Sequence, residues 1–409
     1  NQRYTGKHQR VDMKQGWELK QLGDVCKVFN GSTPLRRKKE YWEDGEINWF
    51  TVDDIREQGR KISFTKQRIS KLGFENSSLK ILPPKSILLC CTASVGEYAM
   101  NEVELTTNQQ FNGIVINDKD FLIPEFLFHF SSTLKNLLLE ISGKTTIDFV
   151  SMTKVRAIPI PIPPLDEQKR IVAKLDDCFA AIDKARANVE KNLQNAKELF
   201  QSQLNQIFSQ KGDGWEEKKL IDVNKFIDYR GRTPEKVSKG IRLITAKNVK
   251  MGYLKREPEE FINPDDYESW MTRGIPRKND VLFTTEAPLA NVALLDTDEK
   301  IALAQRIITF SPVRETLTGE YLHYCLQSKE SQEKILAQAT GATVSGIKSK
   351  LLKEITIYIP SLDIQENIKE KLDVLKSQTQ TLESNYQQEL DALDELKKSI
   401  LQKAFNGEL

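Results

Sequence analysis

Two long segments of the chain repeat apolar residues in alternating steps of four and three positions. This spacing places one apolar stripe along a helix and is typical of helices that pack in a coiled coil. Asp166 and Asp363 precede the stripes and are predicted to cap the helix N-termini, because their carboxylates can accept hydrogen bonds from free backbone N–H groups. The first stripe contains Ile171, Leu175, Cys178, Ile182, Ala185 and Val189, and the second contains Ile368, Leu372, Leu375, Leu382 and Tyr386.

Each stripe meets a polar residue, Asn192 in the first and Glu389 in the second, and a leucine follows each of them. A polar residue in an apolar seam can fix the alignment of paired helices at some cost in stability. Alternatively, the 3.6-residue period of the helix has drifted away from the heptad. We favour the drift.

A mixed pattern of strands and helices precedes the first long helix. Short apolar runs at 87–91 and 113–116 lie between turn residues and predict strands. Residues 121–141 carry apolar positions at helical spacing and predict a helix. Apolar residues alternate with proline at 156–162, which predicts an edge strand or an extended exit, because proline has no N–H to donate to a neighbouring strand.

The sequence repeats itself once. Gly16-Trp17-Glu18 returns as Gly214-Trp215-Glu216, and the segment 163–168 returns as 360–365 with Leu165 matched by Leu362, an offset of 362 − 165 = 197 residues. A period this long indicates a duplicated globular domain with its long helix, since the repeats of a solenoid span only about 20–50 residues.

We therefore expect two α/β (α+β) domains, related by a pseudo-twofold axis and joined by two long antiparallel coiled-coil helices. The expected segments are a first domain at 16–164, a first helix at 165–211, a second domain at 212–360 and a second helix at 361–409. A helix of this length spans roughly 60 Å. Residues 1–15 carry no initiator methionine and are set aside as a trimmed leader or an appended segment.

Composition and charge limit which ligands and partners are expected for this chain. Of 409 residues, 39% are hydrophobic and 29% are charged, and the formal charge is +2, so net charge neither requires nor excludes nucleic acid. Five cysteines without C-x-x-C spacing, beside three histidines, make a metal site unexpected and predict reduced, cytoplasmic thiols. No apolar run approaches the roughly 20 residues of a membrane span. We expect no metal, no cofactor and no membrane partner.

Polar and basic residues gather at two places in each repeat. In the first repeat, Gly31-Ser32-Thr33-Pro34 is followed by the basic run 36–39, and Asn108-Gln109-Gln110 lies further along. The counterparts are Gly231-Arg232-Thr233-Pro234 and Ala304-Gln305-Arg306. Such a turn exposes a hydroxyl and backbone N–H groups, a basic run can contact phosphates, and amides can make paired contacts to adenine. Taken singly, the turn and the run are each explained better by a solvated surface.

In order and in duplicate, these segments resemble the specificity (S) subunits of type I restriction–modification systems. The resemblance covers residues 16–409 and rests on Gly31-x-Thr33-Pro34, Tyr41-Trp42, Asn108-Gln109, the segment 163–168 and the closing segment 404–409. It implies that each globular half is a target recognition domain that reads one half of a split site in double-stranded DNA. It also implies that the helices set the gap and dock two methyltransferase subunits, which recruit motor–nuclease subunits. The second copy lacks the Tyr-Trp pair, which fits domains that read different sequences.

The residues expected to contact DNA carry hydroxyl, amide or cationic side chains. Cations should mostly hold phosphates, and amides and hydroxyls should more often touch base edges. They are Ser32, Thr33, Arg36, Arg37, Lys38, Lys39, Thr51, Gln109 and Gln110 in the first domain, and Arg230, Arg232, Thr233, Lys247, Asn248, Gln305 and Arg306 in the second.

Catalytic motifs do not accompany these segments. Residues 162–165 do not match the Asn/Asp-Pro-Pro-Tyr/Phe motif of an adenine methyltransferase, and residues 143–146 lack the order of a phosphate-binding loop. Asp53-Asp54 could hold a metal in a nuclease, but a solvated or base-contacting role is favoured. We predict a non-catalytic DNA-recognition subunit. The alternative is a coiled-coil scaffold with two globular protein-binding ends, which would lack the steep salt dependence of DNA binding.

Overall fold

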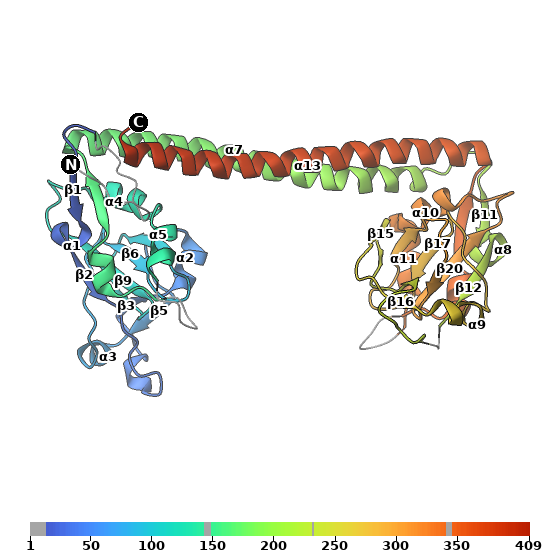
Figure 1. Cartoon of the computed structure of the whole chain (residues 1–409), viewed down its shortest axis with the longest axis horizontal. Coiled ribbons are helices and arrows are strands. Elements are labelled where there is room, and N and C mark those ends of the chain that lie inside the picture. Colours follow the sequence, from blue (N-terminus) through green and yellow to red (C-terminus); the bar gives the residue numbers. More distant parts are fainter. Residues whose placement is uncertain (1–13, 143–148, 231–232, 341–345) are drawn as a thin grey trace. The chain divides into compact units, whose positions relative to one another are not determined.

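A computed structural model describes residues 14–142, 149–230, 233–340 and 346–409 (Figure 1). The backbone divides into two compact units. Unit 1 contains residues 1–189 and 389–409, and unit 2 contains residues 190–388. Each unit therefore combines one globular domain with part of each long helix. Within the described ranges, no helix is long and apolar enough to cross a membrane.

The strands of unit 1 form one five-stranded sheet, one three-stranded sheet and one pair. They are β1 (Glu18–Gln21), β2 (Cys26–Asn30), β3 (Ile47–Phe50), β4 (Lys61–Ile62), β5 (Gln67–Ile69), β6 (Ile87–Cys90), β7 (Tyr98–Asn101), β8 (Thr106–Thr107), β9 (Phe111–Ile116) and β10 (Pro159–Ile162). The orders are β2-β9-β6-β7-β4, β5-β3-β8 and β1-β10. The strands predicted at 87–91 and 113–116 are confirmed as β6 and part of β9. Of the two alternatives for the proline-rich segment, the edge strand is confirmed as β10, which forms a two-stranded sheet with β1.

Short helices complete the domain of unit 1. They are α1 (Leu22–Val25), η1 (Lys39–Tyr41), α2 (Val52–Gln58), α3 (Lys71–Glu75), α4 (Pro124–Ser131), α5 (Lys135–Ile141) and α6 (Met152–Arg156). The single helix predicted over 121–141 is wrong, because the chain forms α4 and α5 with a break between them. At the break, the hydroxyls of Ser132 and Thr133 donate to the carbonyls of His129 and Phe130, which competes with continuation of the helix.

Unit 2 repeats this plan with a four-stranded sheet in place of the five-stranded one. Its strands are β11 (Glu216–Lys219), β12 (Asn224–Asp228), β13 (Ile241–Ile244), β14 (Val249–Lys250), β15 (Tyr253–Leu254), β16 (Phe261–Ile262), β17 (Val281–Thr284), β18 (Val292–Leu294), β19 (Ile301–Leu303), β20 (Ile307–Pro312) and β21 (Thr356–Ile359). The sheet orders are β12-β20-β17-β18, β16-β13-β19, β14-β15 and β11-β21. Its short helices are α8 (Leu220–Val223), η2 (Pro264–Asp266), α9 (Tyr267–Trp270), α10 (Gly319–Gln327), α11 (Lys329–Ala337) and α12 (Ser349–Lys353).

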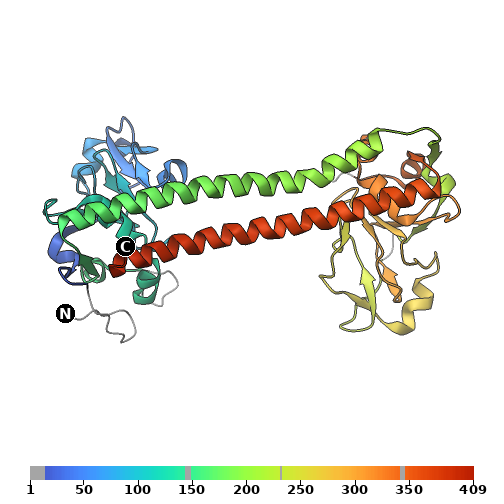
Figure 2. The same ribbon diagram turned by 90° about the horizontal axis from the view of Figure 1, so that it is seen from above.

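The two predicted long helices are confirmed as α7 (Leu165–Ser209) and α13 (Leu362–Asn406), each of 45 residues and each an unbroken ribbon in Figure 2. Within unit 1 they run antiparallel, since Asp183 pairs with Lys397 and Arg186 pairs with Asp394. Asp166 and Asp363 lie inside the first turns rather than at the caps, because the helices begin at Leu165 and Leu362.

The polar residues of the seams lie outside the buried stripe. Asn192 and Glu389 are exposed, whereas Leu193 is half-buried and Leu390 is buried. The stripe therefore passes from Val189 to Leu193 and from Tyr386 to Leu390 in a step of four, which is the drift expected of a 3.6-residue period. A register role for the polar pair is excluded. Leu382 was also placed wrongly in the seam, since it is 38% exposed while Thr379 is 3% exposed.

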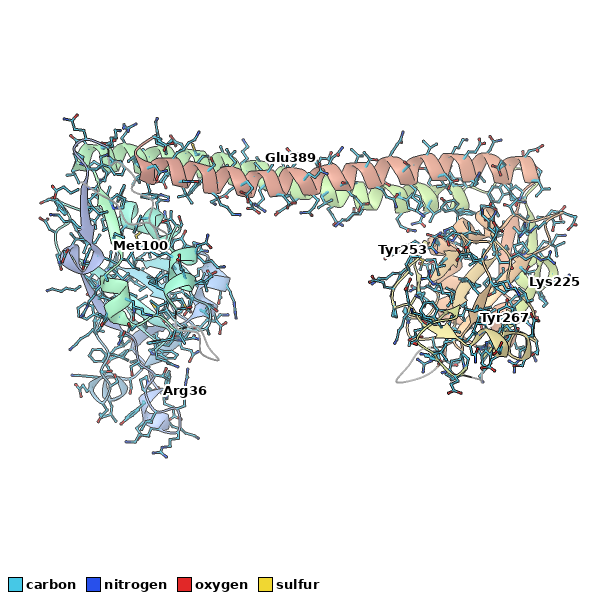
Figure 3. The ribbon with its side chains drawn as sticks, in the orientation of Figure 1. Arg36, Met100, Lys225, Tyr253, Tyr267 and Glu389 are labelled. Carbon is cyan, nitrogen blue, oxygen red and sulfur yellow. The ribbon has the colours of Figure 1, made fainter. Side chains whose placement is uncertain are left out.

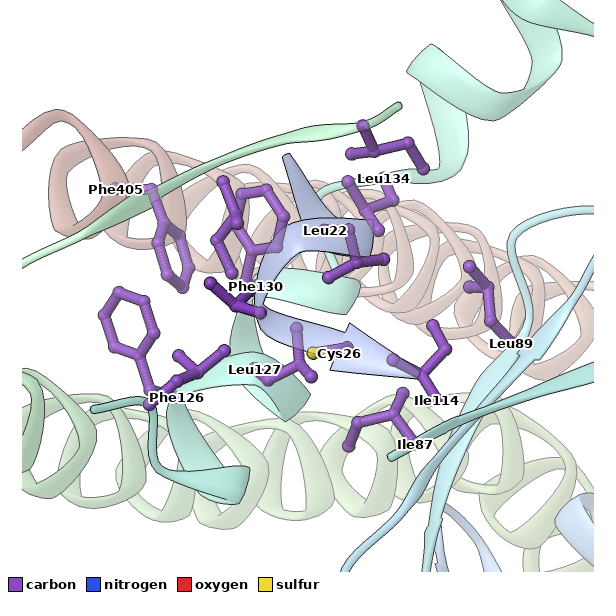
Figure 4. Packing of buried hydrophobic residues seen from close by; sticks show 14 of the residues in the cluster. Leu22, Cys26, Ile87, Leu89, Ile114, Phe126, Leu127, Phe130, Leu134 and Phe405 are labelled. Carbon is purple, nitrogen blue, oxygen red and sulfur yellow. The ribbon is translucent and has the colours of Figure 1, made fainter. Parts of the chain in front are cut away.

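Each unit has a core that both long helices complete. In unit 1, Ile171 and Leu175 of α7 and Leu401 and Phe405 of α13 join one cluster with the sheet and helix α4. Figure 4 shows Phe405 beside Phe126 and Phe130, with ring centroids 5.2 and 5.3 Å apart. In unit 2, Leu204 and Phe208 of α7 and Ile368 and Leu372 of α13 take the corresponding places.

Candidate nucleic-acid interface

In unit 1 the fold brings the two predicted contact turns together. Strand β2 pairs with β9 so that Asn30 lies opposite Asn112. The turn at 31–34 leaves the end of β2, and the turn at 108–110 enters the start of β9, so both turns lie at the same edge of the sheet. The backbone N–H of Gly31 donates to the Phe111 carbonyl at 3.0 Å, and the N–H of Ser32 donates to the Thr107 carbonyl at 3.0 Å.

Close approach of the two turns explains the glycine. A Cβ atom on Gly31 would lie 1.9 Å from the carbonyl oxygen of Asn108. This separation is too short for any side chain, so the position requires glycine. Beyond that contact, the Thr33 hydroxyl donates to the side-chain carbonyl of Gln109. Asn108 is buried and its amide binds Gln110 at 3.1 Å, so it holds the turn, while Gln109 remains exposed.

The basic run of residues 36–39 follows this turn, and all four side chains are exposed. The Arg36 guanidinium carbon lies 3.7 Å from the centroid of the Trp42 ring and 4.7 Å from that of Trp49. Burial against the rings lowers the pKa of Arg36. Lys38 donates to the Tyr41 hydroxyl at 3.1 Å. Arg36 lies on the side of unit 1 that faces away from the long helices (Figure 3).

Unit 2 places its candidate residues by the same topology. Strand β12 pairs with β20 so that Asp228 lies opposite Ile308. Arg230 therefore follows one strand while Gln305 and Arg306 precede its neighbour. Gln305 is half-buried, and Arg306 and Thr233 are exposed. Arg232, also expected to contact DNA, lies outside the described residues.

Three candidate cations of unit 2 are already paired with carboxylates. The Arg230 guanidinium donates to both carboxylate oxygens of Asp228, with Nε 2.9 Å from Oδ1 and Nη2 2.7 Å from Oδ2. Burial raises the pKa of the Asp228 carboxyl, but the bonds from Arg230 outweigh it and the pKa is lowered. Arg306 pairs with Glu286 at 3.0 Å, and Lys247 lies 3.8 Å from Glu260. A ligand must compete with these carboxylates.

Two expected contact residues instead hold a buried turn that occurs in both units. The Thr51 N–H donates to Asp54 Oδ2 at 2.7 Å, and the Thr245 N–H donates to Asn248 Oδ1 at 3.0 Å. Thr51 is 7% exposed and Asn248 is fully buried. Asn248 also donates to the carbonyls of Lys255 and Pro258. The expectation that Thr51 and Asn248 face DNA is therefore wrong, because their polar atoms are committed to the fold.

Comparison with known proteins gives the same duplication. The family model described as type I restriction modification DNA specificity domain matches residues 14–191 and again residues 212–392. The chain belongs to this family. The MjaIX specificity subunit of a type I restriction enzyme from Methanocaldococcus jannaschii is 25% identical, over 96% of this chain and 93% of its own length.

Solved structures share the fold of these specificity domains. The HsdS subunit from Thermoanaerobacter tengcongensis has a TM-score of 0.65 at 22% identity and covers 99% of both chains. A chain from a structure on complex assembly and conformational transition of the type I R-M system has a TM-score of 0.78 at 22% identity, and the match covers 97% of this chain and 100% of that one.

Several residues that shape the specificity domains carried no clear signal in the sequence. Arg273 donates to the carbonyls of Asp228 and Arg230 and so fixes the loop after β12, but nothing in its surroundings along the chain points there. Trp49 was visible as an aromatic residue near the basic run. Its role as a support for Arg36 follows only from the fold. Among the described residues, no group of three or more His, Cys, Asp or Glu side chains could hold a metal ion.

Proposed function

We propose that this chain is the sequence-specific DNA-binding specificity subunit of a type I restriction–modification complex. Each specificity domain reads one half of a bipartite site in double-stranded DNA, and α7 and α13 set the gap between the halves. The helices also dock methyltransferase subunits, two in the complete assembly, and motor–nuclease subunits join through them. The complex works in the cytoplasm, where its DNA lies.

One observation carries this proposal. In unit 1 the turn after the first strand of a sheet lies beside the glutamine-containing turn that precedes the neighbouring strand, and unit 2 pairs the corresponding strands in the same way. In unit 1 the hydrogen bond between Thr33 and Gln109 joins residues that are 76 positions apart. Two similar sets of hydroxyls, amides and cations on one chain suit a target with two separate parts, because base edges are read by such groups and phosphates by cations.

The first experiment measures DNA binding by the chain together with its methyltransferase subunit at several salt concentrations. The double variant Arg37→Ala/Lys39→Ala should reduce the slope of log K against log salt by roughly two units, at about −0.9 per phosphate contact. The charge-preserving variant Arg37→Lys/Lys39→Arg should keep the wild-type slope. Binding without a salt slope, or binding only to protein, would favour the scaffold alternative.

The second experiment addresses catalysis. The purified chain alone is expected neither to methylate DNA with S-adenosylmethionine nor to cleave it, whereas addition of methyltransferase subunits restores methylation. Methyl transfer by the chain without any partner would overturn the proposal that it only recognises DNA.

A further inference from the structure

The loop between β2 and η1 is held in place by two tryptophans. Trp49 Nε1 donates to the Ser32 carbonyl at 3.0 Å, and Trp42 Nε1 donates to the Leu35 carbonyl at 3.4 Å. The two rings meet edge to face, with centroids 4.9 Å apart. Both indole N–H groups are therefore used to fix the loop backbone, and the ring surfaces remain to bind a side chain.

Arg36 occupies those ring surfaces. Its guanidinium carbon lies 3.7 Å from the Trp42 centroid and 4.7 Å from the Trp49 centroid. A guanidinium stacked on an aromatic ring uses its flat face and keeps its N–H edge for hydrogen bonds. Among the described residues, no ion pair or hydrogen bond is recorded for that edge, and the residue is exposed.

This state distinguishes Arg36 from the other arginines near the candidate interfaces. Arg230 is bound to Asp228 and Arg306 to Glu286, so their donors are already engaged. Arg37 is the next residue in the run and is exposed too, but no ring contact is recorded for it in the described part of the chain. Arg36 is a cation of fixed orientation with free donors, whereas Arg37 has the freedom that suits contact with a phosphate.

We propose that Arg36 reads a guanine in the half-site of the first specificity domain, by donating two hydrogen bonds to O6 and N7 in the major groove. This inference rests on the proposed function. Paired donation requires the guanidinium plane to align with the base, and Trp42 and Trp49 fix that plane before DNA arrives. Because the Arg36 side chain is already ordered before DNA binds, less side-chain entropy is lost on binding. A phosphate accepts a cation from many directions and gains less from such support.

The test uses the chain assembled with its methyltransferase subunits and a library of duplexes randomised over both half-sites. Wild-type complex defines the two half-sites. The variant Arg36→Lys keeps the charge but replaces the planar fork with a flexible ammonium that is not oriented by stacking on the two rings. Preference for guanine at one position should therefore fall at least 5-fold, as expected for loss of an oriented bidentate pair of about 1–3 kcal/mol. The matched variant Arg37→Lys should leave every base preference unchanged.

A second variant tests the support. Trp42→Leu retains Arg36 but removes one stacking surface, and it should weaken the same guanine preference, whereas Trp42→Phe should restore part of it. Preference in the second half-site reports that the complex remains folded and active in each variant.

Three results would overturn the assignment of Arg36. They are a first half-site without guanine, an unchanged guanine preference in Arg36→Lys, or an even loss of affinity over all sequences. The proposed function fails separately, if the wild-type complex shows no sequence preference in either half-site.

Discussion

Burial sets the protonation state of a histidine on helix α10 of unit 2. His323 is 4% exposed, and its Nδ1 atom has no hydrogen-bond partner. Nearby, Lys376 donates to the Gly252 carbonyl at 3.0 Å, and Asp373 accepts a hydrogen bond from the Tyr324 hydroxyl. Loss of solvation lowers the pKa of His323 to about 3, and the charge of Lys376 acts in the same direction.

We predict that His323 makes unit 2 sensitive to acid. Because its folded pKa lies below the unfolded value of about 6.5, the stability it contributes is complete above pH 6.5 and is lost as the pH falls toward 3. Between pH 7.5 and pH 5.0 the loss should be about 2 kcal/mol. His323→Phe removes the titrating group and should therefore lose less stability over the same interval. A phenylalanine suits this position, because Phe128 occupies the corresponding position of α4 in unit 1. Thermal unfolding at both pH values measures the difference. An identical pH dependence in the variant would contradict the prediction.

At the residue scale, the sequence predicted groups of residues better than their roles. It assigned the turns of residues 31–34 and 108–110 to DNA contact without placing them together, and the hydrogen bond between Thr33 and Gln109 shows that they lie side by side. It could not separate Asn248, which caps a buried turn, from exposed Thr233. Both are polar residues near a turn in the sequence, and only tertiary packing decides which of them faces solvent.

At the scale of elements, the long helices were the most predictable part of the chain. Their apolar stripe repeats over many turns, whereas strands such as β4 and β8 have only two residues and depend on their neighbours. Residues 121–141 were harder to predict, because the apolar spacing continues through the break while Ser132 and Thr133 bind backbone carbonyls instead. Local hydrogen bonding outweighed periodicity there.

The ends of α7 and α13 should matter most for the stability of the domain that they cover. Phe405 of α13 packs on Phe126 and Phe130 in unit 1, and Phe208 of α7, its counterpart at the repeat offset, packs on Tyr321 in unit 2. Phe405→Ala should destabilise unit 1 by about 3–5 kcal/mol, because it leaves a cavity in the core. Hydrogen exchange should show faster exchange in β2, β6 and β9 and unchanged exchange in unit 2.

The matched variant Phe208→Ala should have the same effect in unit 2 instead, with faster exchange in β12, β17 and β20 and unchanged exchange in unit 1. If either substitution loosened both units equally, the two cores could not be treated as separate.

The helices should also set the gap in the DNA target. Insertion of one heptad in each helix at matching places keeps the apolar stripe continuous and lengthens each helix by about 10 Å. That corresponds to about three base pairs and a rotation near 100°. Binding to the native target should be lost, and a longer gap is favoured only if the helices twist or the DNA bends to restore phase.

The measurement compares duplexes that differ only in gap length, with the methyltransferase subunit present. Insertion in one helix alone should weaken binding more, because it also shifts the antiparallel alignment. An unchanged preference for the native gap in the double insertion would show that these helices do not determine the spacing.

At the scale of the whole molecule, each domain begins and ends at one place. β1 pairs with β10, with Glu18 opposite Ile162, and β11 pairs with β21, with Glu216 opposite Ile359. The chain therefore enters and leaves each domain through adjacent strands beside the start of a long helix. A domain connected in this way can be replaced without redirecting the rest of the chain.

Exchange of residues 16–160 for another specificity domain should change one half-site and leave the second half-site and the gap unaltered. Mapping of methylated positions in a strain that carries the hybrid gene measures all three. The wild-type gene in the same strain is the control. A simultaneous change in both half-sites would mean that the domains do not read DNA independently.

The shared cores also determine the order in which the units can fold during synthesis on the ribosome. Unit 2 needs α7 up to Phe208 and α13 only as far as its first turns at Ile368 and Leu372. Unit 1 needs Leu401, Ala404 and Phe405, more than 200 residues after its own last strand. The domain that leaves the ribosome first is therefore completed last, and until then it exposes the apolar surface that α13 will cover.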